Sequence, residues 1–452
     1  MQRHFRRTIL TGLALVAGAT RWLPAQEPAR IALESYSLPN GLKVILAPDR
    51  STQVVTVDVW YNVGSRNETR SRTGFAHLFE HMMFQGSANV KKAEHFQLVE
   101  RAGGENNGST AEDRTNYYEA LPSNRLNLGL WLEADRMRSL AITDSTFSNQ
   151  REAVKEERRL RVDNQPYTGA IFEGIYALAD SATCFPYAHS IIGSMTDLNA
   201  ARVADVKAFF DLYYTPNNAT LTVVGDFDTA ATKALIQQFF GSIPRGAEPP
   251  PVVCQATFSP GTIRRTWPDA KANLPGVLLG YRIPEYKNDD TPALELLTTI
   301  LGQGESSRIN KTVVRDHKLA QGAIVLSNPA APRRGPGVLL ALGIANQGVS
   351  PDSLERGLSE EFAKVVREGV SESELTKAKN GYRTQLITQQ QQTLAKAEAI
   401  QSANMFLDSP ETVNTNWRRY AAVTVDDVKR VAGKYLRPEN ALVLLITAGA
   451  GQ

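Results

Sequence analysis

The chain has 452 residues, of which 42% are apolar and 21% charged; this length exceeds one ordinary hydrophobic core, so we expect two or more domains. The formal net charge is +3, and it becomes 3 − 4 = −1 when the four arginines of segment 1–25 are set aside. A nearly neutral protein has no electrostatic reason to bind nucleic acid or an anionic membrane surface.

Segment 1–25 has the pattern of a signal peptide. Arg3, Arg6 and Arg7 precede an uncharged, mostly apolar run at 8–19, which is too short to span a bilayer by itself. Cleavage after Ala25 would release a periplasmic or secreted protein. The adjacent arginines also suit the twin-arginine export route, and an uncleaved membrane anchor is the alternative.

The part of the chain that follows contains strand and helix patterns in an irregular order. Apolar runs predict strands at 42–46 and 54–61, the second with alternating apolar positions. The polar stretch 64–73 is typical of a turn, and the next pattern predicts a helix at 73–85.

Two glycines, Gly103 and Gly104, mark a turn before a strand-like segment at 110–121. Long helices are predicted at 126–140 and 145–162. Such an order is typical of an α+β protein and not of a regular βαβ alternation.

Cys184 and Cys254 are the two cysteines of the chain, and they are not in a C-x-x-C arrangement. A cysteine zinc site or a redox motif is therefore not expected. We favour two buried free thiols, although the two cysteines could form a disulfide in an oxidising compartment.

A repeat relates the two halves of the chain. Asp205-Val206-Lys207 recurs as Asp427-Val428-Lys429, so the numbering differs by a constant offset (427 − 205 = 222). Four further pairs share this offset: Tyr213 and Tyr435, Pro216 and Pro438, Asn218 and Asn440, Ala219 and Ala441. Each set ends in a strand-like run, at 221–224 and 443–446. With chance similarity as the alternative, the matches predict two homologous α+β domains at 31–245 and 263–452, joined by a proline-rich linker at 246–262.

The strongest chemical signal is the run His77-Leu78-Phe79-Glu80-His81 in the predicted helix 73–85. Positions i and i+4 share one helix face, so both imidazoles can bind one metal ion. Glu80 projects near the same face, where a base could take a proton from a metal-activated water. The H-x-x-E-H pattern predicts a zinc hydrolase. The alternative is a helix whose polar groups are merely satisfied by packing.

The second half of the chain lacks this histidine pair. At the offset of the repeat, His77 corresponds to Thr299 and His81 to Gln303. We therefore expect one catalytic half and one degenerate half.

A catalytic zinc ion usually has three protein ligands and an open fourth position, so a third ligand must lie elsewhere. His95 and His189 are candidates by residue type. A charged helix offers Glu152, Glu156 and Glu157, although such helices are most often solvated faces. Spacing alone does not choose among the three glutamates.

Several motifs in order resemble those of the M16 peptidases, the family of pitrilysin, insulin-degrading enzyme and mitochondrial processing peptidase. The matching segments are 38–42, 74–86, Gly103-Gly104 with Asn107, Thr110 and Tyr117, 151–157, 186–187 and 306–308. The resemblance covers nearly the whole chain after the signal segment. It implies a short, bacterial M16B-like subunit that forms half of a clamshell.

The resemblance implies a zinc ion (Zn²⁺) held by His77, His81 and a glutamate at a characteristic distance downstream. Counted from His81, that glutamate is Glu157 (157 − 81 = 76). Many members carry another glutamate seven residues before this ligand, in a supporting position. This chain has Gln150 there, which removes a charge and could alter metal affinity or ligand orientation.

Members of this family hold the peptide substrate as an added strand at a sheet edge near the zinc. Asn107 and the segment around Thr110 match that edge; without the resemblance, Asn107 would be an ordinary turn residue. Arg308 matches an arginine of the second half that reaches the substrate. The tyrosine expected to accompany it is Gln321 in this chain. Short members work as pairs, so this loss favours a heterodimer with a second M16 subunit over a homodimer.

The resemblance thus implies a zinc metalloendopeptidase that acts on peptides or unfolded polypeptides. Glu80 is expected to accept a proton from the attacking water and to pass it to the leaving amine. A non-catalytic binding subunit and a dedicated maturation peptidase are the alternatives.

Overall fold

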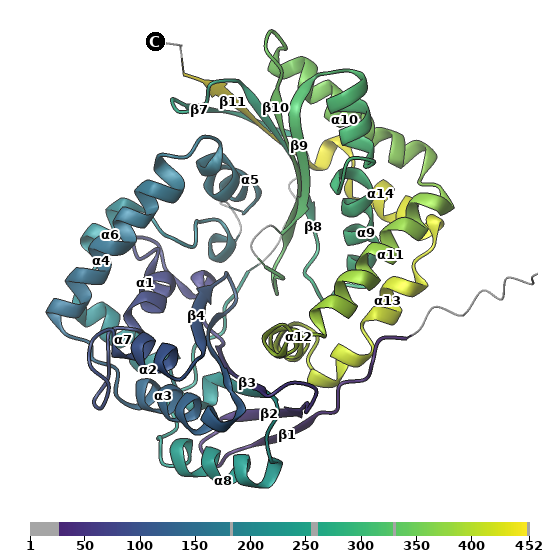
Figure 1. Cartoon of the computed structure of the whole chain (residues 1–452). Helices are drawn as coiled ribbons and strands as arrows, with labels where there is room; N and C mark the ends of the chain where they lie inside the picture. Colours follow the sequence, from purple (N-terminus) through teal and green to yellow (C-terminus); the bar gives the residue numbers. More distant parts are fainter. Residues whose placement is uncertain (1–26, 181–183, 255–260, 329–330, 450–452) are drawn as a thin grey trace, which may run out of the picture.

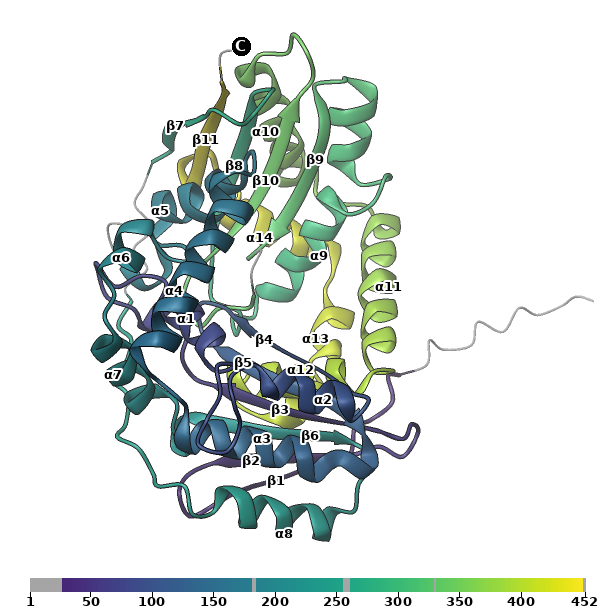
Figure 2. The same cartoon turned by 60° about the vertical axis from the view of Figure 1, so that its left-hand side comes forward.

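The computed structural model describes residues 27–180, 184–254, 261–328 and 331–449. It contains two β-sheets, one from each half of the chain, flanked by helices (Figures 1 and 2). This arrangement confirms the expected α+β class. The predicted signal segment 1–25 lies outside the described residues. None of the described helices is both long and apolar enough to span a bilayer.

The first sheet has six strands in the order β1-β2-β6-β3-β5-β4, so β4 is an edge strand. The strands are β1 (Glu34–Ser37), β2 (Lys43–Pro48), β3 (Val54–Tyr61), β4 (Glu105–Thr110), β5 (Thr115–Pro122) and β6 (Ala219–Gly225). The helices of this half are α1 (Phe75–Met82), α2 (Glu94–Arg101), α3 (Leu126–Ser139), α4 (Asp144–Arg158), α5 (Ile175–Asp180), α6 (Met195–Ala200), α7 (Val203–Tyr213) and α8 (Thr229–Phe240).

The second sheet has five strands in the order β7-β11-β8-β10-β9. The strands are β7 (Ile263–Asp269), β8 (Gly276–Ile283), β9 (Ala320–Ser327), β10 (Gly337–Ala345) and β11 (Ala441–Ala448). The helices of this half are α9 (Thr291–Gly302), α10 (Pro351–Glu368), α11 (Glu372–Gln389), α12 (Thr393–Phe406), α13 (Trp417–Ala422) and α14 (Val425–Tyr435).

The predicted repeat is confirmed at the level of structure. Without β1, the two sheets have the same strand order, and each contains one parallel pair at the same place, β2 with β6 and β7 with β11. Helices α7 and α14 begin and end at positions related by the repeat offset (425 − 203 and 435 − 213). The shared asparagine has one role in both halves: Asn218 donates to the carbonyl of Tyr213 at 2.8 Å, and Asn440 to that of Tyr435 at 2.7 Å.

Strand β3, predicted at 54–61, is buried on both faces. Val55, Val57 and Val59 pack into the main core of the first half, whereas Thr56 and Trp60 point to the opposite face and are also buried. A sheet that is covered on both sides needs a second layer of helices. That second layer comes from the other half of the chain.

The two halves exchange a helix. Ala397, Ile400 and Ala403 of α12 pack against Ile45 and Val224 of the first sheet. In return, α5 of the first half packs on the second sheet, beside β8 and β11 (Figure 1). The helical segment that ends in α5 starts at residue 170, and α12 starts at residue 393. The difference between these two positions is close to the repeat offset. Neither half therefore covers its own sheet alone, a feature that the sequence did not predict.

Cys184 and Cys254 form a disulfide, so the favoured interpretation as free thiols is wrong. Residues 244–254 contain neither helix nor strand, and this extended linker brings Cys254 back to the first half. The two Cα atoms lie 4.8 Å apart, which is within the span that a disulfide needs.

Arg333 and Arg334, which precede β10, reach from the second half into the first. Arg333 donates to Glu112 in the turn between β4 and β5, and the two side chains are 1% and 3% exposed. The backbone nitrogen of Arg334 donates to Asp113 at 3.3 Å, and its guanidinium donates to Asn62 at 2.7 Å. These contacts tie the second half to the turn that ends strand β4.

Replacing Arg333 by glutamine is expected to lower the free energy of unfolding by about 3–5 kcal/mol, because it removes one partner of a buried ion pair and leaves the other in place. Chemical denaturation monitored by circular dichroism measures this change. Lys207→Gln, which removes one partner of an ion pair with both side chains more than half exposed, is the control and should change stability little. An equally small effect of both substitutions would contradict the assignment.

Candidate metal centre

Helix α1, which carries the H-x-x-E-H run, is fixed at its start. Gly74 has a φ of 89°, a left-handed conformation that favours glycine, and a Cβ there would lie 2.7 Å from the carbonyl oxygen of Ile192. The buried carboxylate of Glu68 accepts hydrogen bonds from the backbone nitrogens of Gly74 and Ala76, both at 2.8 Å. A carboxylate at a helix N-terminus satisfies free N–H groups and opposes the helix dipole.

Three potential metal ligands converge where α1 meets α4. The Nε2 atoms of His77 and His81 lie 3.6 and 3.1 Å from Oε2 of Glu157, and the donor atoms of the three residues all lie within 4.8 Å of one another. Zinc with tetrahedral bonds of about 2.0–2.1 Å requires donors that are about 3.3 Å apart. The two imidazoles and the carboxylate therefore fit a zinc ion, and the described residues contain no other such group of three.

The charges at the three ligands also suit a metal ion. Burial, followed by the neighbouring His81, lowers the pKa of His77 to about 4, so this imidazole is neutral at neutral pH and can bind a metal. A hydrogen bond from His81 lowers the pKa of Glu157, which stays anionic. The second oxygen of Glu157 lies 3.0 Å from the guanidinium of Arg161, an interaction that orients the carboxylate.

Glu80 lies beside the three ligands and is held by strand β4. The hydroxyl of Thr110 donates a hydrogen bond to Oε2 of Glu80 at 2.6 Å. Burial raises the pKa of Glu80, although the Thr110 hydrogen bond opposes this shift. A Cβ at Gly108 would lie 3.2 Å from Cγ of Glu80, so a glycine permits this close approach. The arrangement gives a carboxylate of increased basicity next to the predicted metal.

The two other histidine candidates have partners elsewhere. His95 is buried, and its Nε2 lies 2.9 Å from Oε1 of Glu119. His189 lies with Nδ1 3.6 Å from Oε2 of Glu68, the carboxylate that supports the start of α1. Neither histidine belongs to the group of three ligands.

The three acidic candidates on α4 differ in the direction of their side chains. Glu152 is half-exposed and pairs with Lys155 at 2.7 Å, and Glu156 is exposed and pairs with Arg159 at 2.8 Å. Only Glu157 of the three points to the histidines, so the choice implied by the resemblance agrees with the geometry.

Gln150, expected in a supporting position, lies two helical turns before Glu157, about 10 Å along the axis. It is buried, and its amide donates to Asn149 at 2.8 Å. This contact is with a sequence neighbour and not with a ligand, so the structure does not place Gln150 at the three donor atoms.

The edge strand β4 borders the metal centre. Gly108, Ser109 and Thr110 line a cavity of about 370 Å³ together with His77 and Glu157. Asn107, one residue earlier, accepts a hydrogen bond from the backbone nitrogen of Gly108 at 2.9 Å. The open side of β4 leaves main-chain groups free for an added strand.

Arg308 does not lie at the metal centre of its own chain. Its guanidinium donates to Glu374 at 2.7 and 2.8 Å, within the second half. Gln321 is exposed on the edge strand β9. The contact of Arg308 with a substrate therefore stays a prediction, and within this chain Glu374 holds its guanidinium.

Sequence reasoning missed the hydrogen bond that Thr110 donates to Glu80, the support of α1 by Glu68 and the contact of Arg161 with Glu157. Thr110 and Glu80 are far apart in the sequence, so no local spacing links them. The i,i+4 spacing of Glu157 and Arg161 is a signal that could have been read.

Replacing Thr110 by valine is expected to lower kcat roughly 10- to 100-fold, because a hydrogen bond to a charged group contributes about 1.5–3 kcal/mol. Steady-state peptide hydrolysis measures this loss, and Thr110→Ser, which keeps the hydroxyl, is the control. Bound zinc should be unchanged in both variants. Wild-type kcat in Thr110→Val would disprove the orienting role.

Two family models match the chain. One, described as "Insulinase (Peptidase family M16)", matches residues 43–181, which include all three potential ligands. The other, described as "Peptidase M16 inactive domain", matches residues 201–382. The division agrees with the location of the histidine pair in the first half and its absence from the second.

Known proteins resemble the chain over nearly its whole length. "Zinc protease PqqE" of Helicobacter pylori is 30% identical, covering 98% of this chain and 99% of that protein. A crystal structure of a protease from Helicobacter pylori has a TM-score of 0.87 and 29% identity, covering 92% of this chain and all of that one. The periplasmic protease PqqL of Escherichia coli shares the fold, with a TM-score of 0.74 and 20% identity; 93% of this chain matches 48% of PqqL. Since the 30% identity extends from end to end, the chain belongs to the M16 family of peptidases.

Proposed function

We propose that the chain is a zinc-dependent endopeptidase that hydrolyses peptides or unfolded polypeptides. The observation that carries the proposal is the convergence of His77, His81 and Glu157, with donor atoms at 3.1 and 3.6 Å. Glu80 lies next to them in a cavity that opens beside an edge strand. Membership in a peptidase family supports this reading of the geometry.

In the proposed mechanism, His77, His81 and Glu157 hold the metal ion. When bound, zinc supplies the Lewis acidity that makes water a nucleophile at neutral pH and polarises the peptide carbonyl. Glu80 accepts the proton of the attacking water on its carboxylate and then donates it to the leaving amine. Thr110 keeps that carboxylate oriented through its hydrogen bond. Strand β4 aligns the peptide through main-chain pairing, which accepts many sequences.

Metal removal and restoration test the proposal. The purified mature protein should cleave quenched peptides, lose this activity with a chelator that is then dialysed away, and recover it with about one equivalent of zinc. Magnesium should not restore activity, because imidazole ligands favour zinc over magnesium. Full hydrolysis by metal-free protein would refute the proposal.

A non-catalytic binding subunit is the second candidate, favoured by the match of residues 201–382 to an inactive domain. It predicts peptide binding without turnover in the presence of zinc. A third candidate is a maturation peptidase for one dedicated peptide, which predicts no cleavage of a panel of unrelated unfolded peptides.

We further propose that the chain is exported and works with a second M16 subunit. The basic and apolar pattern of segment 1–25 supports export. Two observations support a partner: Arg308 is held by Glu374 away from its own metal centre, and PqqL is about twice as long as this chain. Purification from the native periplasmic or secreted fraction, with measurement of mass and identification of the co-purified chain, tests both points. A fully active homodimer would contradict the heterodimer.

A further inference from the structure

The turn between β4 and β5, at residues 111–114, is buried although it connects the edge strand of the first sheet to its neighbour. Ala111, Glu112 and Asp113 are 2%, 3% and 0% exposed, whereas a connecting segment normally lies on the surface. Two adjacent carboxylates in such a place need cationic or hydrogen-bonding partners. The second half of the chain supplies several of them.

Glu112 is held by Arg333, which belongs to the second half. The guanidinium of Arg333 donates to the carboxylate of Glu112. The same guanidinium lies over two aromatic rings of the first half, 4.1 Å from the ring centroid of Tyr176 and 5.3 Å from that of Tyr187. Two flat rings and one carboxylate therefore fix the position of Arg333, and a fixed cation in turn fixes Glu112.

Asp113 differs from Glu112 because the first half also holds it. It accepts a hydrogen bond from the backbone nitrogen of Arg334 at 3.3 Å. In addition, it pairs with Arg66 at 2.8 Å and accepts a hydrogen bond from the hydroxyl of Tyr187 at 2.9 Å. Loss of a contact with the second half therefore affects Asp113 less than it affects its neighbour in the turn.

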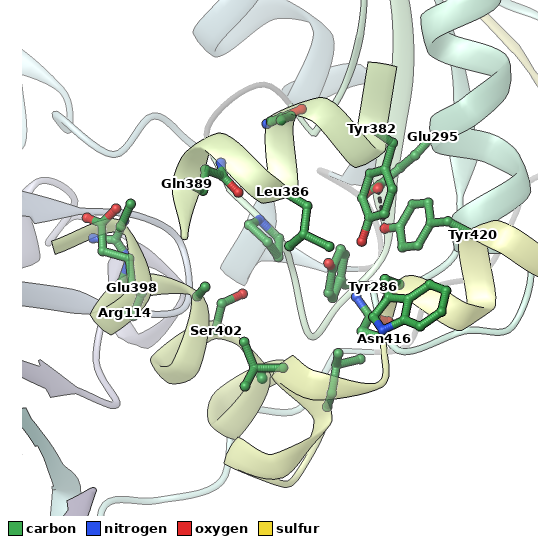
Figure 3. Close-up of a pocket in the computed structure, with 18 of the residues that line it drawn as sticks. Arg114, Tyr286, Glu295, Tyr382, Leu386, Gln389, Glu398, Ser402, Asn416 and Tyr420 are labelled. Carbon is green, nitrogen blue, oxygen red and sulfur yellow. Dashed lines mark hydrogen bonds between the residues drawn. The ribbon is translucent and has the colours of Figure 1, made fainter. Parts of the chain in front are cut away.

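Arg114, the last residue of the turn, is attracted by a further charge of the second half. Figure 3 shows Glu398 of α12 beside Arg114 at one end of a cavity of about 480 Å³, and the two opposite charges attract each other. The guanidinium of Arg114 donates to the carbonyl of Ser109 in β4 at 2.9 Å and to Asn116 in β5 at 2.7 Å. The second half thus acts on the turn at both of its ends.

The turn follows directly on the residue that orients the predicted general base. Thr110, the last residue of β4, donates to Glu80 at 2.6 Å. Glu112 lies two positions later in the chain and lines the same cavity as Thr110 and Glu80. A displacement of Glu112 would therefore move the backbone that carries the hydroxyl of Thr110.

We propose that Arg333 is a positioning residue for the reaction at the metal centre, although it belongs to the half without the histidine pair. It fixes Glu112 and the turn, and through the turn it fixes the hydroxyl of Thr110 that orients Glu80. Such precision matters, because a shift of about 1 Å caused far from the reacting atoms can cost about 100-fold in rate. This inference rests on the proposed peptidase function and gives the second half a role in the reaction of its own chain.

A double-mutant cycle in the zinc-loaded full chain tests whether Arg333 acts through Thr110. Arg333→Gln should lower kcat for quenched peptides about tenfold at a temperature where the variant is folded. Bound zinc should stay near one equivalent, because the three predicted ligands lie on α1 and α4 and not in the turn. In a chain that already carries Thr110→Val, the same substitution should lower kcat less than about twofold, because the hydrogen bond through which it acts is absent.

Lys396→Gln is the matched control. It removes the cation of another ion pair between the two halves, in which Lys396 of α12 contacts Asp49 after β2, and the two side chains are 13% and 22% exposed. This variant should lose stability but keep the wild-type kcat. Arg333→Lys, which keeps a positive charge but not the flat guanidinium, should have a kcat between those of wild type and Arg333→Gln.

Two results would overturn the positioning role: a wild-type kcat in folded Arg333→Gln, or losses that multiply in the double variant. If Arg333→Gln does not fold, Glu112→Gln takes its place in the cycle, because it removes the charge of the same buried pair from the other side. It too should then add little to the loss caused by Thr110→Val.

Hydrogen exchange measured by mass spectrometry separates this inference from the proposed function, because it needs no turnover. Arg333→Gln should speed exchange about tenfold or more in fragments that cover residues 105–118, and Lys396→Gln should not. Faster exchange there, together with no cleavage by the unaltered chain, would leave the anchoring of the turn standing and remove the peptidase function. Cleavage by the unaltered chain, with unchanged exchange and kcat in Arg333→Gln, would do the opposite.

Discussion

Glu80→Gln is expected to lower kcat for peptide hydrolysis by about 10²- to 10⁴-fold, the usual contribution of general acid–base catalysis. The amide has nearly the shape of the carboxylate and can still accept the hydrogen bond from Thr110, but it cannot take a proton from water. KM should change little, because in the proposed mechanism β4 and not Glu80 aligns the peptide.

Two readouts distinguish this catalytic loss from a structural defect. Zinc content, measured by mass spectrometry of the metal, should stay near one equivalent, since Glu80 is not among the three ligands. The melting temperature should match that of wild type. Glu152→Gln, on the exposed side of α4, is the matched control and should keep full activity. Full activity in Glu80→Gln would disprove the assignment of Glu80 as the general base.

His81→Ala should abolish zinc binding and, with it, hydrolysis. Removing a residue that only hydrogen-bonds to a metal ligand weakens metal binding roughly 10- to 100-fold. His81 is itself one of the three predicted ligands, and it also contacts Glu157 at 3.1 Å, so its loss should cost more. Calorimetric titration with zinc measures this loss directly.

Thermal unfolding gives an independent measure. Zinc should raise the melting temperature of the wild-type protein, because a ligand that binds the folded state stabilises it, and should not raise that of His81→Ala. His317→Ala, an exposed histidine of the second half, is the control and should respond like wild type. A full complement of tightly bound zinc in His81→Ala would show that the metal lies elsewhere.

Local patterns predicted the parts of the site that a single element contains. His77, Glu80 and His81 lie on one helix, so their i,i+4 and i,i+3 spacing fixed their common face before the fold was known. The strand at 54–61 was equally readable, because its alternating apolar residues form β3 without change. The strand predicted within 110–121, near Tyr117 and Tyr118, is confirmed as β5, but its start is wrong, because β4 ends at Thr110 and β5 begins at Thr115. The polar sequence of β4 (ENNGST) has no apolar alternation that would mark it as a strand.

Contacts between distant segments needed the structure or the resemblance. By charge and spacing, Glu152, Glu156 and Glu157 were equally good candidates for the third metal ligand. Only the packing of α4 on α1 singles out Glu157. The pairing of Cys184 with Cys254 depends on the path of the linker, which no local pattern specifies. Arg333 is one of many arginines in the sequence, and its buried contact with Glu112 arises from a meeting of elements from opposite halves of the chain.

The reciprocal covering of the two sheets by α12 and α5 explains why the copy without histidines persists. If the first half were expressed by itself, the apolar residues Ile45, Ala47 and Val224 would be exposed to water. Such a surface is prone to aggregation. The second half can therefore lose its metal ligands by mutation and still be needed to cover the first sheet. Substitutions can therefore change the chemistry of the second half, whereas its deletion would uncover the first sheet. If the gene were split at the proline-rich linker, both products would have to reach the same compartment.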